Sequence, residues 1–298
     1  MIDLHSHSSA SDGFFSPTQI AQYAISKKLS AWALTDHDTI DGLHEAARAV
    51  FESGCSMEFV PGIELNIKWQ KGEFHLLGLG LRSFSDELKS TITFLSKDRR
   101  ERNEEILRKM KSETGFEISI SQLEEKFATK QIGRPHFARF LVEKGIVKKP
   151  QEAFDRFLGV GRPWYAPHSG EDLDKAICAI KKSGGLPVLA HPKSLYISLN
   201  KIEPVIASFR ERGVEGVEAY HPCVREAEAV RLEKIARNLG MFVTAGSDFH
   251  GKGVRADRHL GFSAGGEKIA NRFWFQELLP ALGKWDWKES DWLKMQKE

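Results

Sequence analysis

The 298-residue chain is poor in cysteine and has no long apolar run. Its three cysteines, Cys55, Cys178 and Cys223, fall in no paired spacing. This excludes a disulfide framework and a cysteine-based zinc site. No apolar stretch approaches the roughly 20 residues of a membrane-spanning helix, and no basic segment followed by an apolar one opens the chain. We therefore expect a cytoplasmic protein without membrane contacts.

Neither sign of charge dominates the sequence. Lysine and arginine number 43 against 41 aspartates and glutamates, for a formal net charge of +2. This balance gives no broad basic surface for a long duplex nucleic acid. We interpret four arginines of one charged segment, Arg99, Arg100, Arg102 and Arg108, as a solvated helix face. The chain also lacks a glycine-rich phosphate loop, so metal and a few basic side chains would have to hold any polyanionic substrate locally.

Strands and helices alternate at both ends of the chain, and a charged helical segment separates the two regions. Alternation of this kind predicts a parallel sheet with helices outside it. We predict a barrel-like α/β domain from residues 1–88 and 169–298, with residues 89–168 as an inserted, substrate-covering helical domain. A weak strand is expected at residues 116–120. The tail tryptophans are expected on the outside of the barrel: Trp274, Trp285, Trp287 and Trp292.

Histidines and carboxylates follow the predicted strands at one end. His5-Ser6-His7 comes directly after the first strand, and residues two apart in an extended chain point the same way. The carboxyl ends of parallel barrel strands meet on one face. The further residues at this face are Asp12, Asp36-His37-Asp38, Glu64, His191 and Asp248-Phe249-His250. His75 opens its strand instead of ending it, and the pattern alone does not place it.

Each of these motifs has an ordinary structural explanation when taken singly. Asp12-Gly13 can form a turn, and Asp38 can cap a helix. Six strand-associated positions together are different, because burying so many titratable groups without an ion costs more than a fold's marginal stability. Imidazole and carboxylate ligands without thiolate suit zinc, manganese or iron. Nine candidate ligands exceed the needs of one ion, so we predict two or three divalent ions in a metal-dependent hydrolase.

The ordered motifs resemble those of the PHP (polymerase and histidinol phosphatase) phosphoesterases. They are His5-Ser6-His7, Asp12-Gly13, Thr35-Asp36-His37-Asp38-Thr39, Pro61-Gly62-Ile63-Glu64, His191-Pro192 and Gly246-Ser247-Asp248-Phe249-His250. The resemblance implies a distorted (β/α)7 barrel with a trinuclear site, for which we expect manganese first and iron or zinc as alternatives. The implied ligands are His5, His7, Asp12, His37, Glu64, His75, His191, Asp248 and His250. Asp36 and Asp38 would lie behind them or cap a helix.

A segment of the insertion resembles one branch of this family in particular. Gly133-Arg134-Pro135-His136-Phe137 is similar to the branch that includes 3′,5′-nucleotide bisphosphate phosphatase and the RNA-trimming ribonuclease AM. We therefore expect hydrolysis of small nucleoside bisphosphates, or 5′-to-3′ trimming of short 5′-phosphorylated RNA. The expected catalytic residues are Asp248, His191, His221 and Arg134. Arg134 is also expected to bind a substrate phosphate, and His221 either to bind phosphate or to protonate the leaving group. Where many members read His-Pro-Gly-Arg, this chain has His191-Pro192-Lys193-Ser194. Either Lys193 takes over the phosphate contact of that arginine as a less specific charge, or the contact is lost.

Two other functions remain open from the sequence. A histidinol-phosphate phosphatase, or another small-molecule phosphatase, fits the same ligands but not the helical insertion. A non-catalytic metal-binding PHP module is the alternative from a different class, although such modules often lose ligands and every expected position is filled here. The oligomeric state is not determined by the sequence.

Overall fold

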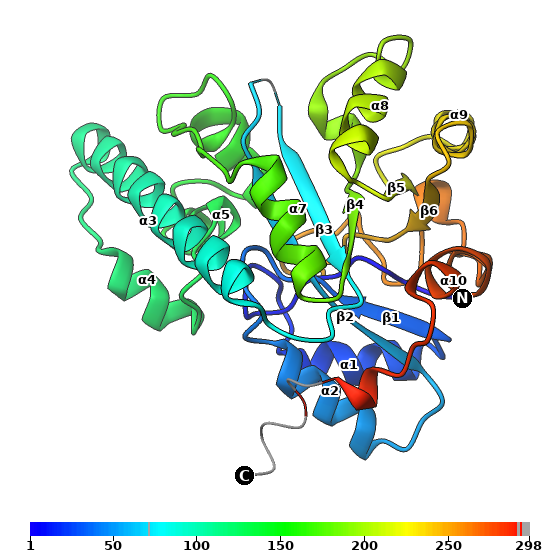
Figure 1. The fold of residues 1–298 in the computed structure, drawn as a ribbon. Helices are drawn as coiled ribbons and strands as arrows, with labels where there is room; N and C mark the ends of the chain where they lie inside the picture. Colours follow the sequence, from blue (N-terminus) through cyan, green and yellow to red (C-terminus); the bar gives the residue numbers. More distant parts are fainter. Residues whose placement is uncertain (71, 291–292, 294–298) are drawn as a thin grey trace.

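The computed structural model describes residues 1–70, 72–290 and 293. A curled sheet in the order β1-β2-β3-β4-β5-β6 forms its centre (Figure 1). The strands are β1 (Ala31–Leu34), β2 (Glu58–Ile67), β3 (Phe74–Leu79), β4 (Leu186–Leu189), β5 (Gly216–Tyr220) and β6 (Phe242–Ala245). The predicted α/β class and barrel-like curvature are confirmed.

Strand β3 runs against its neighbours, contrary to the predicted all-parallel sheet. It pairs antiparallel with both β2 and β4, whereas the other strand pairs are parallel. The beginning of β3 therefore lies at the edge where the parallel strands end. His75, near that beginning, pairs in register with Asn66, two residues beyond Glu64. The reversed direction of one strand thus places the histidine that the sequence pattern left unplaced.

The expected first strand, residues 2–4, is an irregular segment that completes the ring. Its backbone bonds β1 on one side, through Asp3 N to Ala31 O at 3.0 Å. On the other side, Leu4 N donates to Ala245 O of β6 at 3.2 Å. Only isolated bridges form, at Asp3 and Ser6. The structure therefore has six regular strands and an irregular closing segment in place of seven strands.

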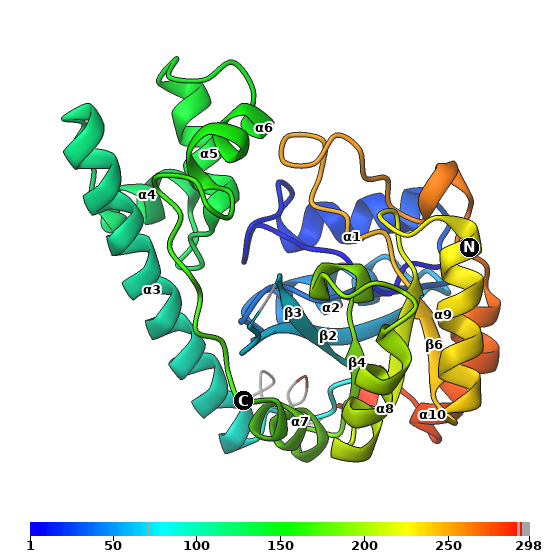
Figure 2. The same ribbon diagram turned by 90° about the horizontal axis from the view of Figure 1, so that it is seen from above.

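Helices cover the outside of this ring (Figures 1 and 2). They are α1 (Pro17–Ser26), α2 (Leu43–Glu52), α7 (Leu173–Lys182), α8 (Ile202–Arg212), α9 (Glu226–Asn238) and α10 (Leu279–Leu282). Helix α1 begins with two features typical of a helix start: the Ser16 side chain accepts from Gln19 N, and Pro17 occupies the first turn. The helices bury their apolar faces against fully buried strand residues such as Trp32 and Phe59.

The intervening helices have an apolar cluster of their own. They are α3 (Asp86–Thr114), α4 (Ile120–Phe127), α5 (Arg134–Glu143), α6 (Pro150–Ala153) and the π-helical turn η1 (Phe154–Leu158). Figure 2 shows them as a group beside the ring. Leu88 and Leu95 of α3 pack with the barrel core, whereas Ile106 and Met110 pack in the separate cluster. The domain boundary at residues 89 and 168 remains a prediction.

The strand expected at residues 116–120 is wrong. Residues 116–119 are irregular and Ile120 begins α4, which Ser119 caps by accepting from Gln122 N. None of the strands in the described part of the chain pairs with these residues, so the local capping box prevails.

The tail packs as expected where it is described. Trp274 and Trp287 are buried in the barrel's core cluster, and Trp287 meets Phe59 edge-on at 5.7 Å between ring centroids. Trp292 lies outside the described residues. The three cysteines are free, as predicted. Among the described helices, none combines the length and apolar character needed to cross a membrane.

Candidate metal centre

The predicted ligands converge on Glu64, a fully buried carboxylate of β2. Its Oε2 lies 3.3 Å from both His5 Nε2 and His7 Nε2, and 3.0 Å from His37 Nδ1. Its Oε1 lies 2.9 Å from both His75 Nδ1 and His191 Nε2. One carboxylate therefore faces five imidazoles, which come from both halves of the chain.

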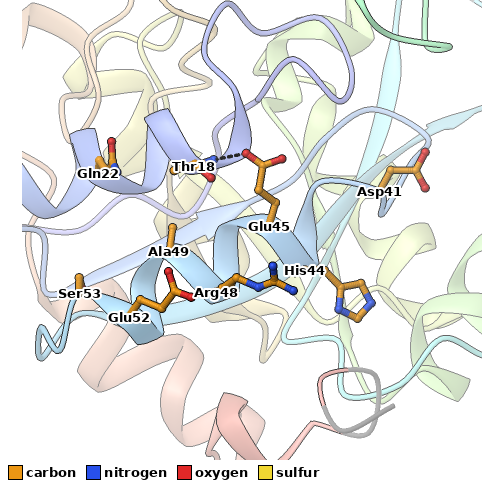
Figure 3. A pocket seen from close by; sticks show the side chains of 9 residues that line it. All are labelled: Thr18, Gln22, Asp41, His44, Glu45, Arg48, Ala49, Glu52 and Ser53. Atoms are coloured by element: carbon orange, nitrogen blue, oxygen red, sulfur yellow. Dashed lines mark hydrogen bonds between the residues drawn. The ribbon is translucent and has the colours of Figure 1, made fainter. Parts of the chain in front are cut away.

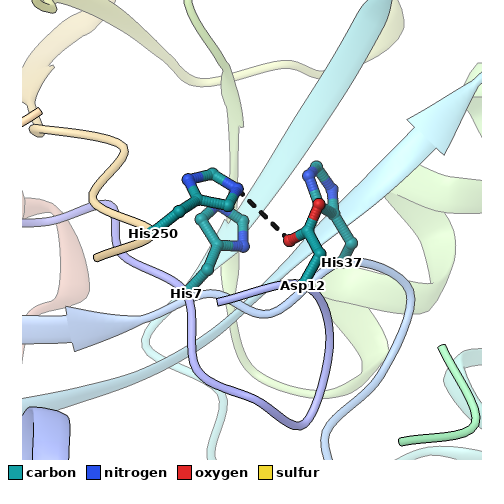
Figure 4. Close-up of side chains that lie close together, drawn as sticks. All are labelled: His7, Asp12, His37 and His250. Carbon is teal, nitrogen blue, oxygen red and sulfur yellow. Dashed lines mark ion pairs between the residues drawn. The ribbon is translucent and has the colours of Figure 1, made fainter. Parts of the chain in front are cut away.

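The ligand atoms form three overlapping groups within the described chain. Each group brings one atom per residue within 4.8 Å of the others. The groups are His7-Asp12-His37-His250, drawn in Figure 4, His5-His7-Glu64-Asp248, and His37-Glu64-His75. His191 belongs to none of them, but its Nε2 lies 3.3 Å from His75 Nδ1. Each pair of groups shares one residue: His7, Glu64 or His37. Shared residues of this kind are expected where neighbouring cations have ligands in common.

Several atoms at the centre of these groups are buried without any hydrogen-bond partner. They are His5 Nε2, both ring nitrogens of His7, Asp12 Oδ1, His37 Nδ1 and Glu64 Oε2. Buried polar atoms are normally paired, because an unpaired one costs about 1–3 kcal/mol. These donors and acceptors are imidazole nitrogens and carboxylate oxygens pointing at one another. The residues thus fit divalent cations, which would satisfy one ligand atom of each of these side chains.

The carboxylates of the site are ionised at neutral pH. Burial raises the pKa of Asp12, Glu64 and Asp248, but the surrounding histidines outweigh it and hold each pKa well below its usual range. Burial lowers the pKa of His37 to about 3, so its imidazole is neutral. Burial opposes the protonation of His5, His7 and His75, but neighbouring carboxylates outweigh it and raise each pKa, that of His7 to about 10. Anionic oxygens coordinate a cation directly, and a cation that binds these three imidazoles would displace their protons.

The loop that carries Asp12 is held tightly under the site. Asp36 accepts from Ser8 N and Ser8 Oγ at 2.8 and 2.6 Å, and from Ser11 Oγ at 2.6 Å. A Cβ on Gly13 would lie 2.4 Å from the carbonyl oxygen of His7, so only glycine permits this close approach. Asp36 therefore fixes the loop from behind, in line with the expectation for it.

Two acidic residues that the sequence reasoning missed orient the ligands. Glu218 of β5 is buried; its Oε2 accepts from His191 N at 2.8 Å and its Oε1 lies 3.0 Å from His5 Nδ1. Asp3 accepts from Ser247 N at 2.9 Å and from Gly261 N at 2.7 Å, and burial raises its pKa to about 6. In the sequence, Glu218 is a single acidic residue within the apolar strand 217–220, and this feature could have indicated its role in the site.

His221 contacts the site through Asp248. Its Nε2 lies 3.3 Å from Asp248 Oδ2, and Nη1 of the buried Arg258 lies 3.0 Å from the same nitrogen. Burial lowers the pKa of His221 to about 4, so the ring is neutral and its nitrogen can accept from Arg258. Arg258 lies in a long loop and carried no sequence signal.

The two other predicted substrate contacts are engaged in ion pairs. Arg134 pairs with Glu73, which precedes β3, and its guanidinium lies 6.0 Å from the Tyr165 ring centroid. Lys193 Nζ lies 2.9 Å from Glu228 Oε2 and is about a third exposed. Neither side chain contacts a predicted ligand.

The interpretation of the four arginines as one solvated face is wrong for two of them. Arg100 and Arg108 are exposed, but Arg99 and Arg102 are buried at 5% and 7% exposure. Helix α3 packs along the barrel mouth, and Arg99 pairs there with the buried Asp38. The periodicity of a charged helix does not reveal which face a neighbouring domain covers.

A separate cavity of about 660 Å³ lies between the outer helices α1 and α2 (Figure 3). Its lining includes Gln22, Asp41 and Arg48, and Thr18 N donates to Glu45 Oε1 across it at 2.9 Å. None of the predicted ligands lines this cavity.

Comparison with known proteins agrees with this geometry. Residues 3–157 match the PHP domain family. The 3′,5′-nucleoside bisphosphate phosphatase of Chromobacterium violaceum is 30% identical over 92% of this chain and 95% of its own. The 5′-3′ exoribonuclease Rnm of Escherichia coli is 29% identical over 83% of this chain and 84% of its own.

A solved structure gives the same picture for the fold. A putative metal-dependent phosphoesterase from Bifidobacterium adolescentis superposes with a TM-score of 0.79 at 27% identity, over 88% of this chain and 91% of that one. The family match covers more than half of the chain, and the similarity extends through both halves of the barrel. The chain therefore belongs to the PHP domain family of phosphoesterases.

Proposed function

We propose that this protein hydrolyses phosphate esters with two to three divalent metal ions held by the nine predicted ligands. The observation that carries this proposal is the set of three overlapping groups of imidazoles and carboxylates with buried, unpaired atoms at their centre. The ligands would be His5, His7, Asp12, His37, Glu64, His75, His191, Asp248 and His250. Oxygen and imidazole donors suit manganese first, and iron or zinc also.

Divalent ions at this site would acidify a water nucleophile and neutralise phosphoryl oxygens. The protein's own groups fix the geometry for that chemistry. Glu218 orients His5 and His191, while Arg258 Nη1 lies 3.6 Å from Asp248 Oδ2 and donates to His221 Nε2. Such supporting contacts keep ligands aligned and typically change metal affinity or activity by about 10- to 100-fold when they are lost.

For the substrate, we propose a small phosphorylated nucleotide, such as a 3′,5′-nucleoside bisphosphate, or the 5′ end of a short RNA. The similarity to the bisphosphate phosphatase and to the exoribonuclease supports this class. The near-neutral charge of +2 favours short substrates over long duplexes. Arg134, Lys193 and His221 would contact the substrate, and a phosphate would then compete with Glu73 and Glu228 for the first two.

The deciding experiment measures phosphate release by purified, manganese-loaded protein from adenosine 3′,5′-bisphosphate and from a 5′-phosphorylated RNA trimer. Release from the bisphosphate alone would identify a nucleotide phosphatase. Stepwise shortening of the trimer from its 5′ end would identify an exoribonuclease. Absence of phosphate release and of RNA shortening with both substrates would contradict the proposed substrate class, and histidinol phosphate would be assayed next.

The ligand assignment has its own test. His191→Ala should lower both bound metal and turnover, because it removes one of the five imidazoles that face Glu64. The control is His259→Ala, which changes an exposed loop histidine. Full activity of His191→Ala at unchanged metal stoichiometry would remove His191 from the set.

A further inference from the structure

Ser194 lies in the short 3₁₀ turn η2 (Pro192–Leu195), three residues after the predicted ligand His191. Its hydroxyl contacts two groups that come from different segments of the barrel. Oγ lies 2.9 Å from His191 Nδ1, and it donates to the carbonyl oxygen of Glu73 at 2.8 Å. Glu73 directly precedes β3, in which the predicted ligand His75 is the second residue. One small side chain therefore connects the segments that carry two predicted ligands.

The backbone around Ser194 holds this hydroxyl in place. Ser194 N donates to His191 O at 2.9 Å, and Glu73 N donates to Ser194 O at 2.8 Å. His191 has φ 25° and ψ 69°, a conformation that residues other than glycine rarely adopt and that persists only where its surroundings hold it. Its N–H donates to Glu218 Oε2 at 2.8 Å. The backbone of His191 is thus held at its N–H and at its carbonyl oxygen, and contacts of the two ring nitrogens set the orientation of the ring.

The hydrogen bonds of Ser194 determine which nitrogen of His191 carries the proton. A carbonyl oxygen can only accept, so the hydrogen between Ser194 Oγ and Glu73 O belongs to the hydroxyl. A hydroxyl has one hydrogen, and its oxygen therefore accepts from His191 Nδ1–H. A neutral imidazole has one N–H, which leaves the lone pair on Nε2. That atom lies 2.9 Å from Glu64 Oε1 and 3.3 Å from His75 Nδ1, among the other predicted ligands.

The two side chains that follow Pro192 have different partners. Lys193 Nζ lies 2.9 Å from Glu228 Oε2 of α9, whereas the hydroxyl of Ser194 contacts His191 and Glu73. Ser194 stands at the arginine position of the His-Pro-Gly-Arg sequence that many family members have, and serine offers no charge to a phosphate. Its contacts indicate a role towards the ligand His191 and not towards the substrate.

We propose that Ser194 is a positioning residue for the metal ligand His191. Its hydroxyl selects the imidazole form with the proton on Nδ1 and keeps Nε2 directed at Glu64 and His75. The inference rests on the metal-dependent function proposed above and adds a residue that supports the metal centre without contacting the substrate. Hydrogen bonds that support a ligand in this way typically change metal affinity or activity by about 10- to 100-fold when they are lost.

The test measures manganese binding to metal-free protein by equilibrium dialysis, with no substrate present. Ser194→Ala removes the hydroxyl, and Ser194→Thr keeps it. The matched control is Ser198→Ala, which changes an exposed serine of the same loop. We expect Ser194→Ala to bind manganese about 10- to 100-fold more weakly at the most affected position, and the other two variants to bind it like the wild type. Rescue by threonine would show that the hydroxyl, and not the packing of the turn, holds His191.

Steady-state kinetics on adenosine 3′,5′-bisphosphate separate a positioning role from a substrate contact. Ser194→Ala should lower kcat at limiting manganese and recover it as manganese is raised, while KM stays at the wild-type value, because the lost interaction acts on the metal ligand and not on bound substrate. A raised KM at saturating manganese, with manganese binding unchanged, would assign Ser194 to the substrate and overturn the proposal.

The binding measurements have equally direct contrary outcomes. Wild-type manganese affinity in Ser194→Ala, or a Ser194→Thr variant as weak as Ser194→Ala, would overturn the inference. If Ser194→Ala does not fold, Ser194→Cys replaces it, since a thiol is only a weak donor and acceptor, and wild-type affinity in that variant would decide against the role. Wild-type protein that binds manganese but releases no phosphate would contradict the proposed function alone, because the binding comparison needs no substrate. Wild-type protein that binds no divalent metal would overturn both.

Discussion

At the scale of single residues, Glu218 is the shared support of two histidines whose rings stack at 5.6 Å between centroids, His5 and His191. We expect Glu218→Gln to lower bound metal or kcat by about 10- to 100-fold, because an amide is a weaker partner for His5 Nδ1 and for His191 N. Metal analysis and phosphate release measure the effect. Glu215→Gln, near the same strand but paired with a surface lysine, is the control. Equal behaviour of the two variants would show that Glu218 does not orient the site.

Arg134 makes a second prediction at this scale. Arg134→Ala should raise KM with the bound metal unchanged, because the side chain lies beside Glu73 and Tyr165 and touches no predicted ligand. A loss of about 1.5–3 kcal/mol in binding, or roughly 10- to 100-fold in KM, is expected for one charged phosphate contact. Steady-state kinetics together with metal analysis separate this outcome from a loss of metal. An unchanged KM would remove Arg134 from the substrate contacts.

At the scale of elements, ion pairs attach α9 to the π-helical turn η4 (Phe273–Leu278) and to Arg272, which directly precedes that turn. Glu233 accepts two hydrogen bonds from Arg272, at 2.8 Å each, and one from Tyr220 Oη at 2.7 Å. The bonds from Arg272 lower the pKa of Glu233 to about 2, against 4.5 for the free side chain. A carboxyl group whose pKa is lower in the folded than in the unfolded protein stabilises the fold at pH values above its unfolded pKa. This stabilisation is lost as the pH falls from about 4.5 to about 2.

Glu233→Gln should therefore lower the free energy of unfolding at pH 7 by about 1 kcal/mol, after allowance for solvent screening of a partly exposed pair. The difference between wild type and variant should shrink as the pH falls from 5 towards 2. Urea unfolding at a series of pH values measures both quantities. A difference that stays constant with pH would mean that the charge of Glu233 does not stabilise this contact.

The direction of a strand is also decided at this scale. The apolar run of β3 predicted a strand correctly, but its orientation was wrong, because no local pattern encodes which neighbour a strand pairs with. The weak strand at residues 116–120 failed for a related reason: extended residues without a partner strand give way to a capped helix.

At the scale of the whole molecule, the site connects the closing N-terminal segment, β2, β3 and the loops after β4 and β6. Metal ions bound there would stabilise only the folded chain. We expect a chelator to lower the melting temperature by roughly 5–10 °C, which corresponds to about 3 kcal/mol for a metal present at 100 times its Kd. Scanning calorimetry with and without EDTA, followed by added manganese, measures this. A melting temperature unaffected by chelation would contradict a metal centre that ties these segments together.

The sequence by itself determined the family, the alternation of strands and helices and the identities of the predicted ligands. These features are local: His5 and His7 lie two residues apart on an extended segment, and Asp248 and His250 repeat that spacing after β6. Only the tertiary structure decided which edge holds His75, that Glu218 and Arg258 support the ligands, and that Ser194 joins His191 to Glu73. Strand direction, burial and hydrogen bonding of side chains depend on contacts between segments far apart in the chain, and residue spacing does not record those contacts.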